Sequence, residues 1–342
     1  MIADYPHHTT TEADAPEIPP RDTDPLMDKR EMPFRGVFYP LGFCVEIYTN
    51  ACEVLEAANE SWGHLRPSRM NASIRLCIGV NDSTLAECPP APTVRAQGHL
   101  LTIIADAENQ ATADLDAAFG FMWVSSTTVH HRLYFRYHFL EALALVIVSG
   151  TFAPAIHAAC VSHRGRGLLL IGPSGAGKST LAYACARAGF TYISDDASYL
   201  LRDADHPRVV GHSHKFRFRP SSRELFPELQ GYELAPRLEG KPSIEVQTSE
   251  LHGLLTSKEA RIHYLILLRR SGSANARLTP ASSDSAVACL EEGLYPVEEI
   301  RRSQVTTLQR LATLQAFEFH YSDLGEAILC LQALTTAPES RA

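Results

Sequence analysis

The hydrophobic positions divide the chain into two parts with different patterns. In the first part, short apolar runs rich in β-branched and aromatic residues predict strands, and longer stretches with helical spacing predict helices. Asn50–Leu65 is expected to be a helix that Asn50 caps, and Arg132–Val148 is expected to be a buried helix. The expected strands are Val37–Tyr48, Ile74–Val80, His99–Ile104 and Phe119–Val124. Residues 31–150 are therefore predicted to form an α+β domain.

The second part begins with a continuously apolar run, Gly165–Ile171, which is typical of a strand covered on both faces of a parallel sheet. A glycine-rich turn follows, then a predicted helix Lys178–Ala188 that ends at Gly189, then a predicted strand Phe190–Ser194. This order is that of a βαβ unit. Further strands are expected at Val209–Gly211, Lys215–Phe218 and Tyr264–Leu268, and closing helices at Leu308–Gln315 and Leu324–Leu334. Residues 151–342 are predicted to form an α/β domain.

Composition adds a tail and limits the classes of partner. Residues 1–30 contain five prolines, many acids and few large apolar side chains, which predicts a disordered tail. The net charge of −8 argues against a general affinity for nucleic acid or for an anionic membrane. The most apolar run, Phe139–Val148, contains Glu141 and is shorter than the roughly 20 residues that span a bilayer. With no secretory signal and with scattered cysteines, the chain is expected to be cytoplasmic.

The glycine-rich turn contains the residues that indicate a chemical function. It fits the phosphate-binding pattern GxxxxGK[ST] completely and lies between a predicted strand and a predicted helix. Its residues are Gly172, Pro173, Ser174, Gly175, Ala176, Gly177, Lys178, Ser179 and Thr180. The glycines let backbone N–H groups turn toward phosphate oxygens, and the positive end of the helix dipole points at the same anions. Lys178 is expected to bind the β and γ oxygens, and the Ser179 hydroxyl to ligate Mg²⁺.

Other phosphate-loop classes are not indicated. The sequence has no LSGGQ run, which argues against a transport ATPase of the ABC type, and no NKxD, which argues against a Ras-like GTPase. The apolar strand Tyr264–Leu268 ends in Arg269-Arg270 rather than in an acid. A carboxylate for the metal must therefore come from another part of the chain.

An acidic pair supplies such carboxylates. Asp195 and Asp196 follow Lys178 by seventeen and eighteen residues, directly after the strand Phe190–Ser194. We expect this strand to pair with the loop strand, so that both end at the edge of the sheet where ligands bind. One carboxylate is then placed to hold Mg²⁺ and the other to accept a proton from an attacking hydroxyl. The alternative is an ordinary turn cap, a frequent role of Asp after a strand.

A basic segment follows the acidic pair. Lys215, Arg217 and Arg219 alternate with Phe216 and Phe218, so the cations share one face of a strand and the aromatic rings the other. The cations are expected either to contact a transferring phosphate or an anionic acceptor, or to form the solvated outer face of an edge strand. His212 and His214 lie nearby without a third ligand at suitable spacing, so no metal site is predicted there.

Together these residues resemble the catalytic core of the HPr kinase/phosphorylase family. His157 precedes Gly172 by fifteen residues, and the acidic pair follows the loop lysine at the family's spacing. The resemblance covers about residues 156–198 and implies an α/β P-loop kinase domain. It also implies that Asp195 is the general base, that Asp196 lies near the metal, and that His157 lines the site and assists the base. Without the family, His157 would be interpreted as a core histidine.

The sequence also departs from that family. The family's EIRGLG motif, which supplies a metal-ligating glutamate, has no counterpart, and the first domain does not resemble that of the bacterial HPr enzymes. The chain is more similar to HPr-kinase-related proteins of unassigned substrate. We therefore expect a kinase that uses ATP and Mg²⁺ to phosphorylate a hydroxyl of a peptide, a protein or a small metabolite. The first domain is expected to select this acceptor or to form a homo-oligomer contact.

Two alternatives from other classes stay open. One is a nucleotide-dependent switch that hydrolyses ATP slowly and signals to a partner protein. The other is a carboxykinase-like enzyme, since phosphoenolpyruvate carboxykinases have a related core, although ligands for its second metal are not evident in the sequence.

Overall fold

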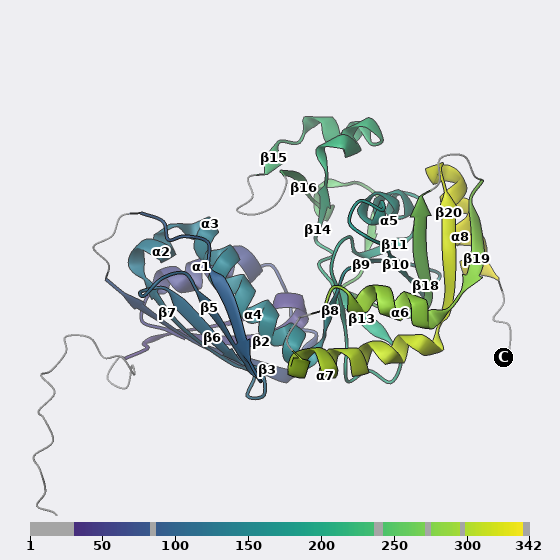
Figure 1. The fold of residues 1–342 in the computed structure, drawn as a ribbon. Helices are drawn as coiled ribbons and strands as arrows, with labels where there is room; N and C mark the ends of the chain where they lie inside the picture. The colour runs from purple at the N-terminus through teal and green to yellow at the C-terminus, as the bar shows by residue number, and fades with distance from the viewer. Residues whose placement is uncertain (1–30, 83–86, 236–241, 271–274, 295–297, 338–342) are drawn as a thin grey trace, which may run out of the picture.

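The computed structural model describes residues 31–82, 87–235, 242–270, 275–294 and 298–337 (Figure 1). The predicted disordered tail, residues 1–30, lies outside the described residues. Two large sheets occupy successive parts of the chain, with helices packed on each, and a small third sheet stands beside the second. The protein thus has a mixed α/β fold.

Within the described residues, the first sheet has seven strands in the spatial order β1-β2-β3-β7-β6-β5-β4. The pairs β2–β3 and β3–β7 are parallel, and the remaining pairs are antiparallel. The strands are β1 (Phe34–Phe38), β2 (Phe43–Thr49), β3 (Arg69–Asn81), β4 (Thr93–Gln97), β5 (Leu100–Ile104), β6 (Gln110–Asp114) and β7 (Phe119–Ser125). The strands predicted at Ile74–Val80, His99–Ile104 and Phe119–Val124 are confirmed.

One face of this sheet is buried by helices, as its alternating pattern requires. In β2, Phe43, Val45 and Ile47 are buried while the residues between them are partly exposed. The buried face packs against α1 (Cys52–Trp62) and against a long helical stretch (Figure 1). That stretch follows α2 (Ser126–His130) and consists of α3 (Arg132–Phe135), η2 (Arg136–Glu141), α4 (Ala142–Ile147) and η3 (Val148–Phe152).

Two local predictions in this part are wrong. Val37–Tyr48 is not one strand, because the chain turns at η1 (Pro40–Gly42), where Leu41 and Gly42 have φ angles of 51° and 85°. Asn50 does not cap α1, since the N-cap is Ala51 and makes no side-chain cap bond. The Asn50 amide instead donates to the carbonyl of Val80 at 2.8 Å and accepts from its N–H at 2.7 Å. The side chain therefore ties the start of α1 to β3.

The buried helix predicted at Arg132–Val148 is confirmed and continues to Phe152. In the part of the chain that the structure describes, Arg132–Phe152 is the one helix long and apolar enough to cross a membrane by length and composition. Its apolar window is 61% buried inside the protein, with Phe139 and Leu143 in the core. Packing against the first sheet accounts for its apolar character.

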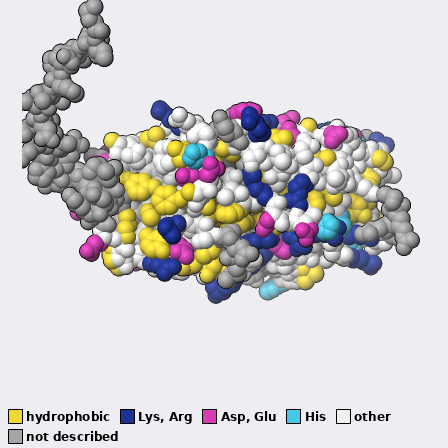
Figure 2. Space-filling model, turned by 90° about the horizontal axis from the view of Figure 1, so that it is seen from below, with side chains coloured by type: hydrophobic (Ala, Val, Ile, Leu, Met, Phe, Trp, Pro, Cys, Tyr) yellow, Lys and Arg dark blue, Asp and Glu magenta, His cyan; other side chains and the backbone are white. Residues whose placement is uncertain are grey.

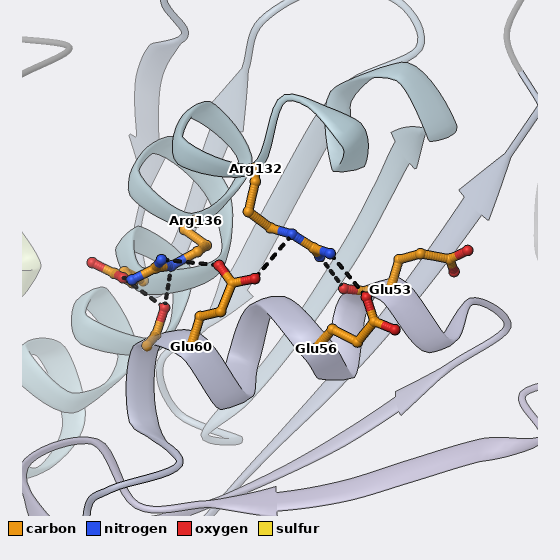
Figure 3. Close-up of polar contacts among 7 residues, drawn as sticks. Glu53, Glu56, Glu60, Arg132 and Arg136 are labelled. Atoms are coloured by element: carbon orange, nitrogen blue, oxygen red, sulfur yellow. Dashed lines mark hydrogen bonds and ion pairs between the residues drawn. The ribbon is translucent and has the colours of Figure 1, made fainter. Parts of the chain in front are cut away.

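Charged side chains join this helix to α1 on the outside (Figure 3). Arg132 contacts Glu56 at 2.9 Å and Glu60 at 3.4 Å, and Arg136 contacts Glu60 at 3.0 Å. Exposed ion pairs of this kind contribute about 0–1 kcal/mol each, so they orient the two helices more than they stabilise them. On the face that Figure 2 shows, hydrophobic side chains gather over the half that holds the first sheet.

The second sheet carries the predicted βαβ unit. Along its main path, in the described residues, the order is β17-β11-β9-β10-β18-β13-β12-β8, and β20 and β19 extend it beside β18. The strands are β8 (Ala155–Ile156), β9 (Ala158–His163), β10 (Arg166–Ile171), β11 (Thr191–Ser194), β12 (Ser198–Leu200), β13 (Arg208–Gly211), β17 (Leu255–Thr256), β18 (Glu259–Arg270), β19 (Arg277–Ala281) and β20 (Gln315–Tyr321).

The loop strand and the strand before the acidic pair are not neighbours, contrary to the prediction. β9 lies between β10 and β11 and is antiparallel to both. Because both strands run opposite to β9, they run parallel to each other and still end at the same edge. The acidic pair therefore reaches the loop across one intervening strand.

Helices cover both faces of this sheet, which explains the unbroken apolar run in β10. Leu168 and Leu170 pack toward α5 (Lys178–Arg187) and α8 (Leu324–Thr336), while Leu169 and Ile171 face α6 (Ser283–Glu291) on the other side. The closing helix predicted at Leu324–Leu334 is confirmed. The one predicted at Leu308–Gln315 is wrong: α7 (Glu298–Leu308) precedes it, and the segment itself is η7 (Gln309–Thr313) followed by β20.

The basic segment belongs to the small sheet, in which β14 (Lys215–Phe218) is an edge strand. β14 pairs with β16 (Ser243–Gln247), which also pairs with β15 (Leu234–Ala235). Short helical turns flank these strands at η4 (Pro220–Glu224), η5 (Pro227–Gly231) and η6 (Thr248–Glu250). Phe216 and Phe218 are buried against Tyr183 of α5, so the predicted alternation is confirmed. This packing places the cations of β14 beside the start of α5.

Candidate functional site

The glycine-rich turn between β10 and α5 has the conformation that its glycines permit. Gly175 and Gly177 have φ angles of 90° and 95°, in the left-handed region that side chains disfavour. At Gly172, an added Cβ would lie 2.9 Å from the Cβ of Ala176, so the turn is also closely packed. Ala176 closes it with an N–H bond to the carbonyl of Pro173 at 3.1 Å. The backbone thus curls around the N-terminus of α5, where an anion is favoured.

Lys178 opens α5 and points back into the turn. Its side chain is buried, and Nζ donates to the carbonyls of Gly172 at 2.7 Å and Pro173 at 3.3 Å. Burial lowers the pKa of the ammonium, Asp196 opposes this shift, and Arg219 adds to it. A phosphate that enters the turn would replace these carbonyls as the partner of Nζ.

His157 connects Lys178 to the acidic pair. Its Nε2 lies 2.8 Å from Nζ of Lys178 and its Nδ1 lies 3.2 Å from Oδ1 of Asp196. Because an ammonium can only donate, Nε2 accepts and the ring proton resides on Nδ1, which donates to the carboxylate. The hydrogen bond from His157 is the main reason that the pKa of Asp196 is lowered. The imidazole therefore orders Asp196, whereas the resemblance implied that it assists Asp195.

The two carboxylates of the acidic pair have opposite environments. Asp195 is half-buried, and its Oδ2 accepts from the N–H of Arg217 at 2.8 Å. Burial, and to a smaller extent the charge of Asp196, raises the pKa of Asp195 to about 6, although the hydrogen bond from the Arg217 N–H lowers it. The carbonyl of Asp195 accepts from the Ser179 hydroxyl at 3.1 Å. Adjacent residues thus combine a carboxyl that titrates near neutrality with one that stays ionised.

The cations of the basic segment divide into two groups. Arg217 contacts Glu245 at 2.9 Å and Lys215 contacts it at 3.8 Å. Arg219 reaches the phosphate loop, where it donates to the Ser174 hydroxyl at 3.0 Å. Arg269, which ends the apolar run of β18, lies apart from these cations and pairs with Glu318 at 3.3 Å.

A cavity of about 680 Å³ joins most of these groups. Its lining contains the His157–Asp196 pair, Arg217, Arg219 and six residues of the loop region, namely Ser174, Gly175, Gly177, Lys178, Ser179 and Thr180. The predicted site residues outside this lining are Asp195, Lys215 and three loop residues, Gly172, Pro173 and Ala176. Asp196 is thus the member of the acidic pair that faces the open space, and Asp195 lies behind it under Arg217.

The oxygen atoms of described residues that face the cavity are too few to hold a metal ion by themselves. They suit a magnesium ion that is also bound by a nucleotide. In the described ranges, no group of three or more His, Cys, Asp or Glu side chains is placed to hold a metal. The cavity does offer the Ser179 hydroxyl and the Asp196 carboxylate, and hard oxygen ligands are what Mg²⁺ prefers. Mg²⁺ in such sites takes its remaining ligands from substrate phosphates and water. Ser179 and Asp196 therefore fit the ion.

Sequence reasoning missed residues that come from distant segments. Ser222 and Ser243 line the same cavity and are buried, and the Ser243 hydroxyl has no hydrogen-bond partner among the described residues. Glu245 orients two cations of β14 from the neighbouring strand. A lone serine or glutamate in an ordinary strand carries no motif, so only the pairing of β14 with β16 reveals these residues.

No family model and no curated protein matches the sequence. Among solved structures, the Hpr(Ser) kinase/phosphatase from Coxiella burnetii is similar to this chain, with 14% sequence identity and a TM-score of 0.30. The match covers 53% of this chain and 93% of that protein. A similarity at this level carries no argument, and the case for a function rests on the geometry of the site.

Proposed function

We propose that this chain is a kinase that transfers the γ-phosphoryl group of Mg·ATP to a hydroxyl group. The observation that supports this most is the cavity around the phosphate loop, which brings Lys178, Asp196 and two arginines together next to Asp195. A loop alone would account for nucleotide binding. Two carboxylates with separated pKa values beside it are what phosphoryl transfer to a hydroxyl needs in addition.

In the proposed reaction the acceptor oxygen attacks the γ-phosphorus as the bond to the β–γ bridging oxygen breaks. ADP leaves, and the proton of the acceptor hydroxyl passes to Asp195 through one intervening water, because Asp195 lies behind Asp196 and outside the cavity lining. A carboxyl with a pKa of about 6 is ionised at neutral pH and accepts a proton more readily than an ordinary aspartate. Asp196 stays ionised because the hydrogen bond from His157 lowers its pKa. Together with Ser179, it would ligate Mg²⁺. A bound Mg²⁺ would supply charge neutralisation for the phosphoryl group during transfer.

The cations stabilise the phosphoryl group during transfer. Lys178 exchanges the loop carbonyls for phosphate oxygens, while Arg217 and Arg219 line the open side of the cavity. Most of the rate enhancement then comes from positioning and from fixed charges, as in other phosphoryl transfers. The acceptor belongs to the class of hydroxylated peptides, proteins or small metabolites.

The test is incubation of the purified chain with Mg²⁺ and γ-labelled ATP, together with cell extract, synthetic serine peptides or hydroxylated metabolites. We expect label on a discrete acceptor. If the label is released only as inorganic phosphate with every acceptor, the kinase proposal is wrong. Slow hydrolysis with nucleotide-dependent binding of a partner protein would then favour a switch.

A further inference from the structure

A second, smaller cavity lies on the other side of the phosphate loop. It has a volume of about 140 Å³ and is lined by Gly177, Thr180, Leu225 and the segment Tyr321–Leu324. Gly177 and Thr180 also line the large cavity. The two cavities therefore meet at the first turn of α5, where the loop would hold a triphosphate.

Strand order explains why this cavity lies opposite the acidic pair. β18 pairs in parallel with β10, and β20 pairs in parallel with β18, so all three end at the same edge of the sheet. The acidic pair follows β11 on one side of β10, and Tyr321–Leu324 follows β20 on the other. A triphosphate whose terminal phosphate lies near Asp196 thus extends across the loop toward the end of β20.

The side chains of the small cavity suit a nucleoside rather than a further phosphate. Leu225 is a large apolar side chain that is 46% exposed, and Leu324 is half-buried. Within the lining there is no lysine or arginine, while Asp323 contributes a negative charge. Asp323 Oδ1 accepts from the N–H of Glu326 at 2.9 Å, which fixes the carboxylate at the start of α8. A carboxylate so held repels phosphate and accepts from a sugar hydroxyl or a base N–H.

Tyr321 forms part of the wall of the small cavity. The side chain is buried, and its hydroxyl would lie 3.1 Å from a Cβ added at Gly177. A side chain at this position would therefore crowd the Tyr321 hydroxyl at the place where the two cavities meet.

We propose that this small cavity binds the nucleoside part of the nucleotide. The base packs against Leu225 and Leu324, and the ribose lies near Thr180 and Asp323. The inference rests on the proposed function, since it requires a triphosphate on the loop. It adds a specificity site at the end of β20 that the loop motif does not contain.

The test compares the binding of Mg·ATP with that of inorganic tripolyphosphate and Mg²⁺, measured by calorimetry. The wild-type protein is expected to bind ATP at least about tenfold more tightly, because only ATP fills the small cavity. Leu225→Ala should weaken ATP binding several-fold, and Leu225→Glu should remove the preference for ATP. Leu225→Ala should leave the affinity for tripolyphosphate unchanged, and Leu225→Glu should reduce it less than it reduces the affinity for ATP. The matched control is Leu329→Ala, since Leu329 is an exposed leucine of α8 outside the cavity lining.

The outcomes separate this inference from the proposed function. Equal binding of both ligands by the wild-type protein, or an unchanged ATP preference in Leu225→Glu, would overturn the nucleoside site and leave the loop intact. Binding of neither ligand would overturn the loop assignment, and with it both proposals. Equal loss of affinity for both ligands in Leu225→Glu would also count against the inference, because it indicates damage to the loop.

Discussion

At the scale of single residues, the acidic pair shows how neighbours in sequence acquire different chemistry. The Asp195 carboxyl is buried under the backbone of Arg217, and the Asp196 carboxylate receives a hydrogen bond from His157. The first environment favours the neutral form and the second the charged form. The spacing from Lys178 predicts that both lie beside the loop, but it does not predict which faces the cavity. That depends on β14 and on His157, which are distant in sequence.

The pKa of Asp195 predicts the pH dependence of transfer. Its value of about 6 in the folded protein means that the carboxyl is protonated below that pH and ionised above it. A base must be ionised, so kcat/KM should rise about tenfold per pH unit below about pH 6 and level off above it. The measurement is a pH profile of acceptor labelling between about pH 5 and about pH 8. A profile that is flat through this range would remove Asp195 as the base.

Lys178 is expected to contribute to both binding and turnover. Lys178→Ala removes the loop side chain that is proposed to bind the β and γ oxygens, so Mg·ATP affinity and label transfer should each fall at least about tenfold. The matched control is Lys258→Ala. The ammonium of Lys258 contacts the carbonyl of Arg66 away from the cavity. Unchanged turnover in Lys178→Ala would contradict the loop assignment.

At the scale of elements, periodicity predicted β10, α5 and α8 because their apolar patterns reflect burial on one or both faces. Periodicity gave wrong predictions where the form or position of an element depends on contacts with another segment of the chain. The order of β10, β9 and β11 is set by strand pairing between separate segments of the chain. An expected helix is replaced by η7 and β20, because Phe317 and Phe319 pair with β18. Local sequence does not show which distant segments will pair, whereas the glycine-rich turn between β10 and α5 is a local motif that the sequence predicts directly.

Asn50 offers a direct test of such a connection between elements. Asn50→Ala removes the two hydrogen bonds that the Asn50 side chain makes to the backbone of Val80. The free energy of unfolding should fall by about 1–3 kcal/mol. Urea denaturation measures it, with Asn59→Ala as the control, since Asn59 is exposed on α1 and should change stability by less than about 0.5 kcal/mol. Equal effects of the two substitutions would mean that the hydrogen bonds of Asn50 do not contribute to stability.

At the scale of the whole molecule, the two large sheets share a core. Tyr199, Leu201 and Ile300 from the second part pack into the hydrophobic cluster of the first sheet, and α7 runs beneath both parts (Figure 1). Glu259 of β18 forms ion pairs with Arg69 of β3 and with Arg208 of β13. The sequence predicted two parts but not this junction, because its contacts join distant segments of the chain, as between Arg69 and Glu259.

A shared core predicts that ligand binding in one part stabilises the other. Both tryptophans, Trp62 and Trp123, belong to the first sheet and its helices, so their fluorescence reports on that part alone. At about 100 times its Kd, Mg·ATP adds about 2.7 kcal/mol to the stability of the state that binds it. The tryptophan melting temperature should therefore rise by several degrees in the wild-type protein but not in Lys178→Ala. If only the circular dichroism transition moves, the two parts unfold independently.

The central claim, that the site transfers phosphate with Asp195 as the base, is tested most directly by one paired measurement. Label transfer from γ-labelled ATP to the acceptor is compared in the wild-type protein and in Asp195→Asn, with Mg·ATP affinity measured on the same preparations. Transfer should fall at least about a hundredfold in the variant while affinity stays within a few-fold. Transfer by Asp195→Asn at the wild-type rate would contradict the claim.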